Sequence, residues 1–205
     1  MTDKIEIVTA TKNAGKIKEF EQLLANLPFN LRSLNDFPDT IEPEETGTTF
    51  IANAVLKARY YAAQTKVWAL ADDSGLEVEA LGGAPGVFSA RYAGENATDT
   101  EKIKKLLSEI SESGAQSRRA RFVCAIAIVD AQGTTIYTAE GVCAGEIADA
   151  PRGVNGFGYD PVFIPDGFSE TFGEMSGAVK QQISHRASAS EKIIQYLRGI
   201  YAASG

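Results

Sequence analysis

One short stretch decides the fold of this chain, Ala69-Leu70-Ala71-Asp72-Asp73-Ser74-Gly75-Leu76, in which an apolar run meets two carboxylates, a hydroxyl and a glycine. The run has the composition of a buried strand, and we expect the strand to end at Asp72 and the chain to turn at Gly75. Residues that follow a buried strand emerge at the rim of the sheet, where open α/β folds bind ligands. A type I turn built from Asp, Ser and Gly is the alternative. The adjacent carboxylates favour a functional site, because two like charges side by side are usually tolerated only if they are solvated or share a cation.

The composition is that of an ordinary globular protein. The 205 residues are 44% hydrophobic and 23% charged, and we expect one domain covering 1–205. No run approaches the ~20 apolar residues that cross a bilayer, and no signal-peptide pattern precedes the first strand, so we expect a cytoplasmic protein without a membrane partner. The net charge of -7 argues against a nucleic-acid partner, which needs a basic stripe. A small polyanion is allowed, because local cations, N–H groups and a metal can hold it.

Soft metal ligands are scarce. The chain has one histidine and two cysteines, Cys124 and Cys143, and both cysteines lie in apolar β-like runs where a thiol behaves as a small buried hydrophobe. A zinc centre needs more nitrogen and sulfur ligands. Any metal is therefore expected to be held by oxygen, which indicates Mg²⁺, Mn²⁺ or Ca²⁺.

The hydrophobic pattern combines strand and helix periods and predicts a mixed α/β or α+β fold. Expected strands cover 5–8, 68–70, 121–130 and 134–142, and expected helices have apolar faces over 17–27, 50–62, 103–110 and 193–201. Thr98-x-x-Glu101 and Ser188-x-x-Glu191 are capping boxes that predict the starts of the last two helices. The turn at 131–133 predicts a hairpin.

A polar turn follows the first strand and contains Asn13-Ala14-Gly15-Lys16. At the start of a helix it aims N–H groups, the positive end of the helix dipole and a lysine at one point, which suits phosphate. It is not a Walker motif, because the distal glycine is missing and Ile17 replaces the hydroxyl residue. A loop with a solvated lysine is the alternative.

Glu44 and Glu45 form a second acidic pair, just before a predicted helix start at 46–49. A structural role beside the helix dipole is the default interpretation. Together with Asp72 and Asp73, however, the pair could supply the one or two carboxylates that Mg²⁺ takes, with waters and phosphates completing its shell.

Two further segments carry chemical groups. In Gly156-Phe157-Gly158-Tyr159-Asp160-Pro161 the glycines flank Phe157, whose ring could stack on a base, although a core position is equally compatible. Lys180-Gln181-Gln182-Ile183-Ser184-His185-Arg186 could donate hydrogen bonds to carbonyl or phosphate oxygens. A Ser-His-Asp hydrolase is set aside, because the sequence has no Gly-x-Ser-x-Gly elbow beside this segment.

Taken together, these segments resemble the inosine triphosphate pyrophosphatase family, the Ham1-like pyrophosphatases of non-canonical purine nucleotides. The matching stretches lie in family order at 9–19, 44–50, 71–76, 82–92, 156–161 and 180–186. The resemblance covers nearly the whole chain and implies an elongated two-lobed fold, a central twisted mixed sheet flanked by helices, with the active site in the cleft. It also implies a homodimer. Lys12 departs from the glycine common at its position, and Gly177-Ala178-Val179 lacks the usual acidic residues.

The resemblance implies a Mg²⁺-dependent enzyme that cleaves ITP, dITP and XTP between the α and β phosphates. By similarity, Glu45 and Asp73 bind the metal and Asp73 accepts the proton of the attacking water. The implied substrate-binding residues are Thr11, Lys12, Asn13, Ala14, Gly15, Lys16, Ser74, Phe157, Gly158, Tyr159, Asp160, Lys180, His185 and Arg186, and the supporting residues are Asp72 and Glu19.

Donors such as His185 and Arg186 would form hydrogen bonds with a 6-keto oxygen. The 6-amino group of adenine is itself a donor, so it would face these donors without forming a hydrogen bond. Sequence does not identify the residue that rejects guanine, nor divide the work between Asp72 and Asp73. Two other hypotheses stay open: a Maf-like pyrophosphatase for other modified nucleotides, and a non-catalytic nucleotide sensor.

Overall fold

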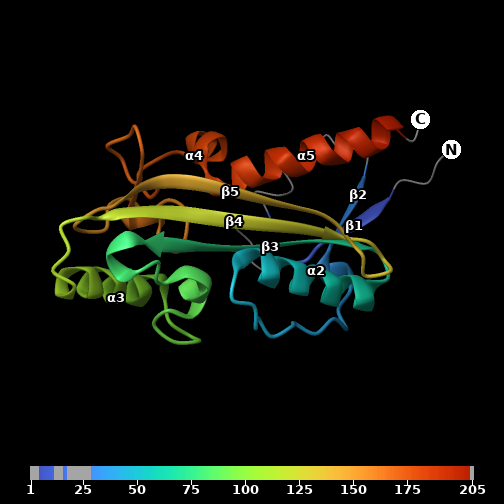
Figure 1. The fold of residues 1–205 in the computed structure, drawn as a ribbon, viewed down its shortest axis with the longest axis horizontal. Helices are drawn as coiled ribbons and strands as arrows, with labels where there is room; N and C mark the ends of the chain where they lie inside the picture. Colours follow the sequence, from blue (N-terminus) through green and yellow to red (C-terminus); the bar gives the residue numbers. More distant parts are fainter. Residues whose placement is uncertain (1–4, 12–15, 18–28, 204–205) are drawn as a thin grey trace. The chain divides into compact units, whose positions relative to one another are not determined.

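The structure is a computed structural model that describes residues 5–11, 16–17 and 29–203, the last three by their backbone alone (Figure 1). The described strands are β1 (Glu6–Thr9), β2 (Asn30–Ser33), β3 (Trp68–Val78), β4 (Arg119–Val129), β5 (Thr135–Ile147) and β6 (Phe163–Pro165). The described longer helices are α2 (Phe50–Thr65), α3 (Asp99–Glu112), α4 (Gly177–Ile183) and α5 (His185–Ala203). Short 3-10 helices are η1 (Leu34–Asp36), η2 (Glu79–Leu81), η3 (Gly86–Arg91) and η4 (Asp160–Val162). This content confirms the predicted mixed α/β class.

The strands form a six-stranded sheet in the order β2-β1-β3-β4-β5-β6. β1 runs parallel to both β2 and β3, whereas β5 and β6 are antiparallel, so the sheet is mixed as predicted. β2 and β3 lie on opposite sides of β1 and run in the same direction, so the chain must cross over between them, and α2 lies in that connection.

The sequence prediction that the strand ends at Asp72 is wrong. β3 continues for 11 residues to Val78, and Gly75 lies inside it. The reason is that Leu76 and Val78 keep the strand buried beyond the carboxylates. β1 does end here, because the last β1–β3 pair is Thr9 with Leu70. The carboxylates therefore lie just past the carboxyl end of the neighbouring strand and not past the end of their own.

The chain separates into two compact units, one formed by 1–73, 124–141 and 187–205 and the other by 74–123 and 142–186, here called unit 1 and unit 2. In unit 1, α5 packs Ala189, Ile193 and Leu197 into a core with strand residues such as Ile7 and Leu70. In unit 2 the core joins β3 to α3 and also includes these aromatic residues: Phe122, Tyr159, Phe163 and Phe172. The expectation of one domain over 1–205 stays a prediction.

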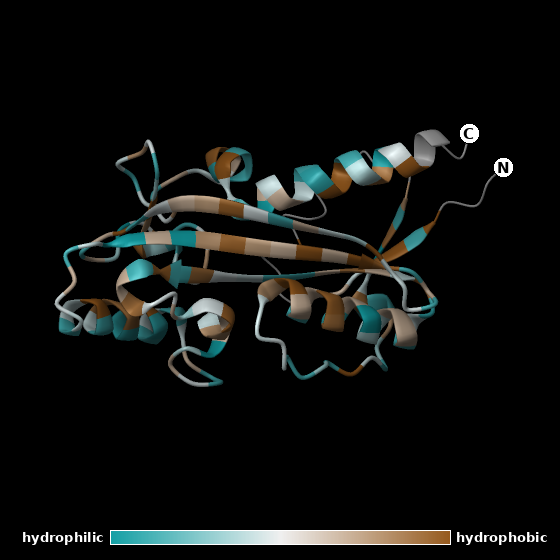
Figure 2. Cartoon of the chain, viewed as in Figure 1, coloured by the Kyte–Doolittle hydropathy of each residue, from teal (hydrophilic) through white to brown (hydrophobic). Residues whose placement is uncertain are grey.

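The burial of β4 and β5 explains their sequences. All residues of β4 from Phe122 to Val129 are buried, which fits a strand with neighbours on both sides and an apolar run over 122–129 (Figure 2). From Ala139 to Ile147 β5 alternates buried and exposed residues, as expected for a strand with one face toward a core. β5 continues to Ile147, beyond the strand expected over 134–142. Among the described residues, none of the helices is both long and apolar enough to span a membrane.

Helix starts follow local capping chemistry in two of three predicted cases. Thr49 caps α2 by accepting from the N–H of Ala52, and the capping box of Thr98 and Glu101 opens α3. The prediction that Ser188 caps the last helix is wrong, because α5 already begins at His185, after Ser184 adopts an extended backbone. Most of the helix predicted over 17–27 lies outside the described residues.

Candidate active site

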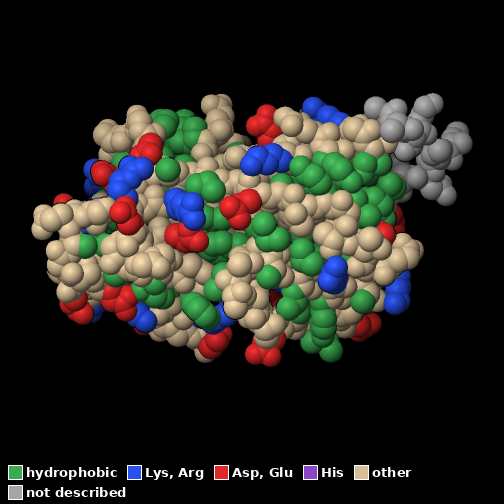
Figure 3. Space-filling model, in the orientation of Figure 1, with side chains coloured by type: hydrophobic (Ala, Val, Ile, Leu, Met, Phe, Trp, Pro, Cys, Tyr) green, Lys and Arg blue, Asp and Glu red, His purple; other side chains and the backbone are tan. Residues whose placement is uncertain are grey.

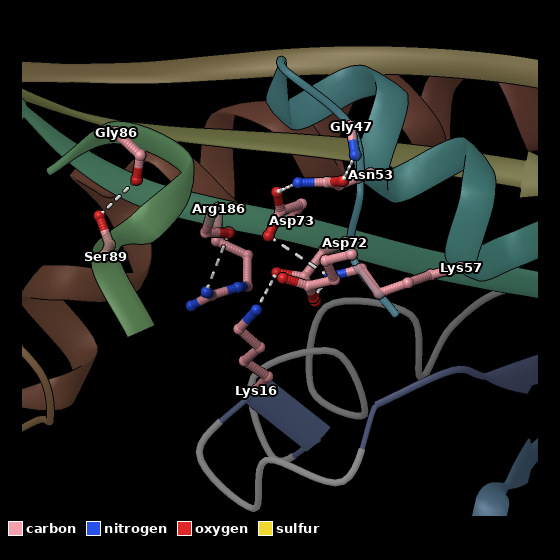
Figure 4. Close-up of polar contacts among 11 residues, drawn as sticks. Lys16, Gly47, Asn53, Lys57, Asp72, Asp73, Gly86, Ser89 and Arg186 are labelled. Carbon is pink, nitrogen blue, oxygen red and sulfur yellow. Dashed lines mark hydrogen bonds and ion pairs between the residues drawn. The ribbon is translucent and has the colours of Figure 1, made fainter. Parts of the chain in front are cut away.

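The carboxylates of β3 are buried in unit 1. Asp72 is 2% and Asp73 is 6% exposed. Asp73 Oδ2 accepts a 3.0 Å hydrogen bond from Asn53 Nδ2, and Asp73 Oδ1 lies 3.3 Å from Lys57 Nζ (Figure 4). Asn53 and Lys57 are four positions apart on α2, so both side chains leave the same face of that helix. One helix face therefore binds both oxygens of Asp73.

The ammonium of Lys57 joins Asp73 to the acidic loop. Its Nζ lies 2.8 Å from Glu45 Oε1, and Glu45 is half-buried, whereas Glu44 is exposed. The structure thus brings together Glu45 and Asp73, the two residues expected to bind metal, around a single cation.

The backbone next to Glu45 is held by Asn53 as well. Asn53 Oδ1 accepts a 2.7 Å hydrogen bond from the N–H of Gly47. A Cβ at position 47 would lie 2.5 Å from that oxygen and 2.9 Å from the backbone nitrogen of Asn53, so only glycine fits without a shift. Because Asn53 is fully buried, its amide has a defined partner on each side.

Burial and charge compete at these groups. Burial raises the pKa of Asp73, and although Lys57 lowers it, the pKa stays above the ordinary value of an aspartate. Burial lowers the pKa of Lys57, but the carboxylates of Asp73, Asp72 and Glu45 outweigh it and the pKa is raised. Lys57 is therefore a firmly charged ammonium surrounded by more negative than positive charge.

Asp72 has its own cationic partner. Lys16 Nζ lies 2.9 Å from Asp72 Oδ2, which places the lysine of the predicted phosphate turn beside the β3 carboxylates within unit 1 (Figure 4). At the other end of that turn, the N–H of Thr11 donates to the carbonyl of Thr9. The following predicted residues lie outside the described part of the chain: Lys12, Asn13, Ala14, Gly15 and Glu19.

The donor set suits a hard cation. Within the described residues, no three or more His, Cys, Asp or Glu side chains form a ready-made metal cluster. Mg²⁺, however, commonly takes one or two carboxylates and completes its shell with waters and substrate phosphates. Glu45 and Asp73 fit that role, because their oxygens already converge on one positive charge, that of Lys57 Nζ.

In unit 2 a buried ion pair holds the glycine-flanked aromatic segment. Asp160 Oδ2 accepts from Lys180 Nζ at 2.6 Å and from the N–H of Phe157 at 2.8 Å. Asp160 is 2% and Lys180 is 7% exposed. Gly156 has a φ of 76°, and a Cβ there would lie 1.9 Å from Asp160 Oδ2. Glycine is therefore required both by the left-handed backbone of the turn and by the space that the Asp160 carboxylate occupies.

Phe157 is half-buried and does not belong to the core of unit 2, which decides against a core position. Lys180 Nζ lies 4.8 Å from the centre of its ring, and the guanidinium carbon of Arg186 lies 5.9 Å from it. Both distances are within the range of cation–π attraction. An aromatic face with two cationic donors beside it can receive a flat, electron-rich ring.

The other predicted residues of unit 2 have mainly internal contacts. Tyr159 lies in the core, and its hydroxyl donates to the carbonyl of Ser89 at 3.0 Å. His185 is 4% exposed, and its ring stacks on that of Phe122, with centres 4.7 Å apart. Arg186 has the largest fully buried side chain in the described part of the protein, and its Nη2 donates to Ser74 Oγ at 3.4 Å (Figure 4).

Sequence reasoning missed Asn53 and Lys57. A signal was present, since both occur between Phe50, Ala54 and Ala58, on the helix face that is buried. A polar residue at a buried helical position needs a partner, and the carboxylates of Glu45, Asp72 and Asp73 were candidate partners. Ile51 lies within the apolar pattern expected over 50–62 but is 38% exposed.

Comparisons with known proteins agree with one another. The sequence pattern of the Ham1 family matches residues 7–196. The dITP/XTP pyrophosphatase of Geobacillus kaustophilus is 48% identical over 200 residues, which cover 98% of this chain and 98% of the relative. That of Thermosynechococcus vestitus is 48% identical over 193 residues, 94% of this chain and 95% of the relative.

Solved structures give the same result. A HAM1 protein from Coxiella burnetii has a TM-score of 0.89 at 44% identity, over 95% of this chain and 99% of that chain. The Staphylococcus aureus Ham1 protein has a TM-score of 0.85 at 42% identity, over 95% of this chain and 98% of that chain.

Proposed function

The chain belongs to the Ham1 family, and from this premise we propose that it is a dITP/XTP pyrophosphatase. It hydrolyses ITP, dITP and XTP to the monophosphate and pyrophosphate and so removes these nucleotides from the pool. The names of relatives at 48% identity support this activity. The observation that carries it is the placement of Glu45 and Asp73 around one ammonium, because phosphoryl transfer needs charge neutralisation and positioning more than covalent help.

We propose Mg²⁺ as the cofactor, held by Glu45 and Asp73. When bound, it would neutralise triphosphate charge and make a water molecule more acidic. The oxygen-only donor set supports this choice over softer metals.

Asp73 is the proposed proton acceptor. Its pKa lies above that of an ordinary aspartate because of burial, which makes its carboxylate a better base. Asn53 holds one of its oxygens and Lys57 faces the other. Asp72, paired with Lys16, is assigned the supporting role.

The phosphate chain is assigned to the turn from Thr11 to Lys16, with Glu19 as a supporting residue. The ammonium of Lys16 is directed at the carboxylate end of the site by its contact with Asp72, which supports this assignment. A cation there offsets the charge of a triphosphate.

The base is assigned to unit 2, with its ring on Phe157. His185 and Arg186 are the proposed donors to the 6-keto oxygen. Ser74, whose Oγ accepts from Arg186, is assigned a contact with the substrate. The rest of the pocket is assigned to Gly158, Tyr159, Asp160 and Lys180. Adenine would set its amino group against those donors, a mismatch worth about 1–3 kcal/mol. The two cations beside the Phe157 ring support this assignment.

We also propose a cytoplasmic homodimer without nucleic-acid or membrane partners. The homodimer rests on the family resemblance. The net charge of -7 supports the absence of a nucleic-acid partner. On the face drawn in Figure 3, acidic and basic side chains of the described residues are interspersed and form no basic stripe.

The decisive experiment measures pyrophosphate release from ITP, dITP, XTP, ATP and GTP, each with Mg²⁺ and with EDTA. We expect rapid release from the first three with Mg²⁺, little from ATP and GTP, and none with EDTA. Equal turnover of all five would reject the base specificity. Preference for modified pyrimidines would favour the Maf-like alternative, and tight ITP binding without product would favour the sensor.

A second measurement tests the proton acceptor. Asp73→Asn keeps the volume and removes one charge, so it should abolish turnover while the circular dichroism spectrum stays native. Asp72→Asn is the matched control and should lose less activity. Full activity in Asp73→Asn would remove Asp73 from its role.

A further inference from the structure

The carboxylate of Asp99 has a partner far along the chain. Asp99 is the first residue of α3, but Thr98 and Glu101 already form the capping box of that helix. Asp99 Oδ2 instead accepts a 2.6 Å hydrogen bond from the N–H of Gly158, 59 positions away in unit 2. Its other oxygen lies 2.6 Å from Lys102 Nζ, one turn along α3.

This bond fixes the backbone on one side of Phe157, and a second carboxylate fixes the other side. The N–H of Phe157 donates to Asp160 Oδ2 at 2.8 Å, and the next N–H, that of Gly158, donates to Asp99. These two N–H groups flank the Cα of Phe157. Both of its backbone dihedral angles are therefore constrained, and with them the direction in which its ring leaves the chain.

The two carboxylates are not equivalent. Asp160 is buried and belongs to the same segment as Phe157, whereas the side chain of Asp99 is 47% exposed and belongs to a different element. Burial raises the pKa of Asp99, but Lys102 and the N–H of Gly158 lower it more, so its pKa lies below the ordinary value and the residue accepts as a carboxylate. Charged acceptors form the stronger hydrogen bonds.

We propose that Asp99 is a positioning residue for base binding, which holds the ring of Phe157 in its stacking orientation through the N–H of Gly158. This inference rests on the proposed function, because the ring is taken as the surface that receives the purine. Asp99 touches no substrate and acts through Phe157 alone.

The experiment separates the base end of the substrate from the phosphate end. Calorimetry measures the Kd of IMP and of inorganic pyrophosphate for the wild type, Asp99→Ala, Asp99→Asn, Lys102→Met and Glu101→Ala. Loss of stacking geometry should weaken IMP binding by Asp99→Ala about tenfold and leave pyrophosphate binding unchanged. The Kd of IMP for Asp99→Asn should lie between those of the wild type and Asp99→Ala, because an amide oxygen can still accept from the N–H of Gly158.

The controls remove the neighbouring contacts of Asp99. Lys102→Met removes the ion pair and Glu101→Ala the capping box, but neither touches Gly158, so IMP should bind as to the wild type. Because the side chain of Asp99 is exposed, its variants should fold as the wild type does, and thermal melts of each variant check this.

A double variant makes the test specific to the aromatic ring. If Asp99 acts through Phe157, Asp99→Ala should weaken IMP binding no further in a Phe157→Ala background. Additive losses, equal weakening of IMP and pyrophosphate, or an unchanged IMP Kd in Asp99→Ala would each overturn the inference. A wild type that binds no IMP and hydrolyses no ITP would instead remove the proposed function, and the inference with it.

Discussion

Asn53 Nδ2 donates a 3.0 Å hydrogen bond to Asp73 Oδ2. Asn53 is fully buried and Asp73 is only 6% exposed. The same amide accepts from the N–H of Gly47, two residues after Glu45. One side chain thus sets the positions of both proposed metal ligands, Glu45 through its loop and Asp73 directly.

Asn53→Ala should therefore lower kcat for ITP on the order of a hundredfold, because small displacements of reacting groups have effects of that size. It should also reduce the free energy of unfolding by about 1–3 kcal/mol, since buried partners lose their hydrogen bonds. Pyrophosphate release and urea melts measure the two effects.

Gln64→Ala is the matched control. Gln64 is a second amide that ties this loop to α2, through the N–H and carbonyl of Ile41, and its side-chain hydrogen bonds within the described part of the protein involve neither Glu45 nor Asp73. Gln64→Ala should reduce the free energy of unfolding without the loss of kcat expected for Asn53→Ala. A loss of kcat as large as that of Asn53→Ala would show that general loosening of the loop is sufficient.

Gly47→Ala should be destabilising and should lower activity. The added Cβ would meet Asn53 Oδ1 at 2.5 Å and the Asn53 backbone nitrogen at 2.9 Å. Gly199→Ala is the same chemical change at an exposed position of α5 where a Cβ meets nothing within 4 Å. It should stabilise the protein by about 0.5–1 kcal/mol. Thermal melts that moved in the same direction for both variants would contradict the contact at Gly47.

Lys180→Met should destabilise unit 2 strongly, by about 3 kcal/mol, because it leaves the carboxylate of Asp160 buried without its counter-charge. Adding Asp160→Asn removes that charge, so the double variant should be more stable than Lys180→Met alone. Urea denaturation measures the difference. Equal stability of the single and double variants would show that the N–H of Phe157 already satisfies Asp160.

Burial raises the pKa of Cys143 to about 11. Since the thiolate is the reactive form, little is present at pH 8, and the folded protein should react slowly with a thiol reagent. The sequence contains two cysteines, both buried in the structure, so denaturation should release two reactive thiols per chain. Rapid labelling of Cys143 in the native protein at pH 8, located by mass spectrometry, would show that the thiol is accessible.

Local interactions made parts of the fold predictable. The caps at Thr49 and Thr98 involve partners three positions away, and the hairpin after β4 is held by Asp130, whose Oδ1 accepts from the N–H groups of Gln132 and Thr134. The start of α5 was missed for the converse reason, because Ser188 matches a capping pattern that the chain does not use.

By itself, the sequence determined the mixed α/β class, the family, and the types of residue at the site, since these depend on periodicity and on motifs that lie in order along the chain. Only the tertiary structure decided that β3 runs on past its carboxylates and that Asn53 and Lys57 meet Asp73, 20 and 16 positions away. The physical reason is that such contacts depend on which face of α2 packs against β3. A pattern of neighbours along the chain specifies that a face is buried, but not which distant side chain it meets.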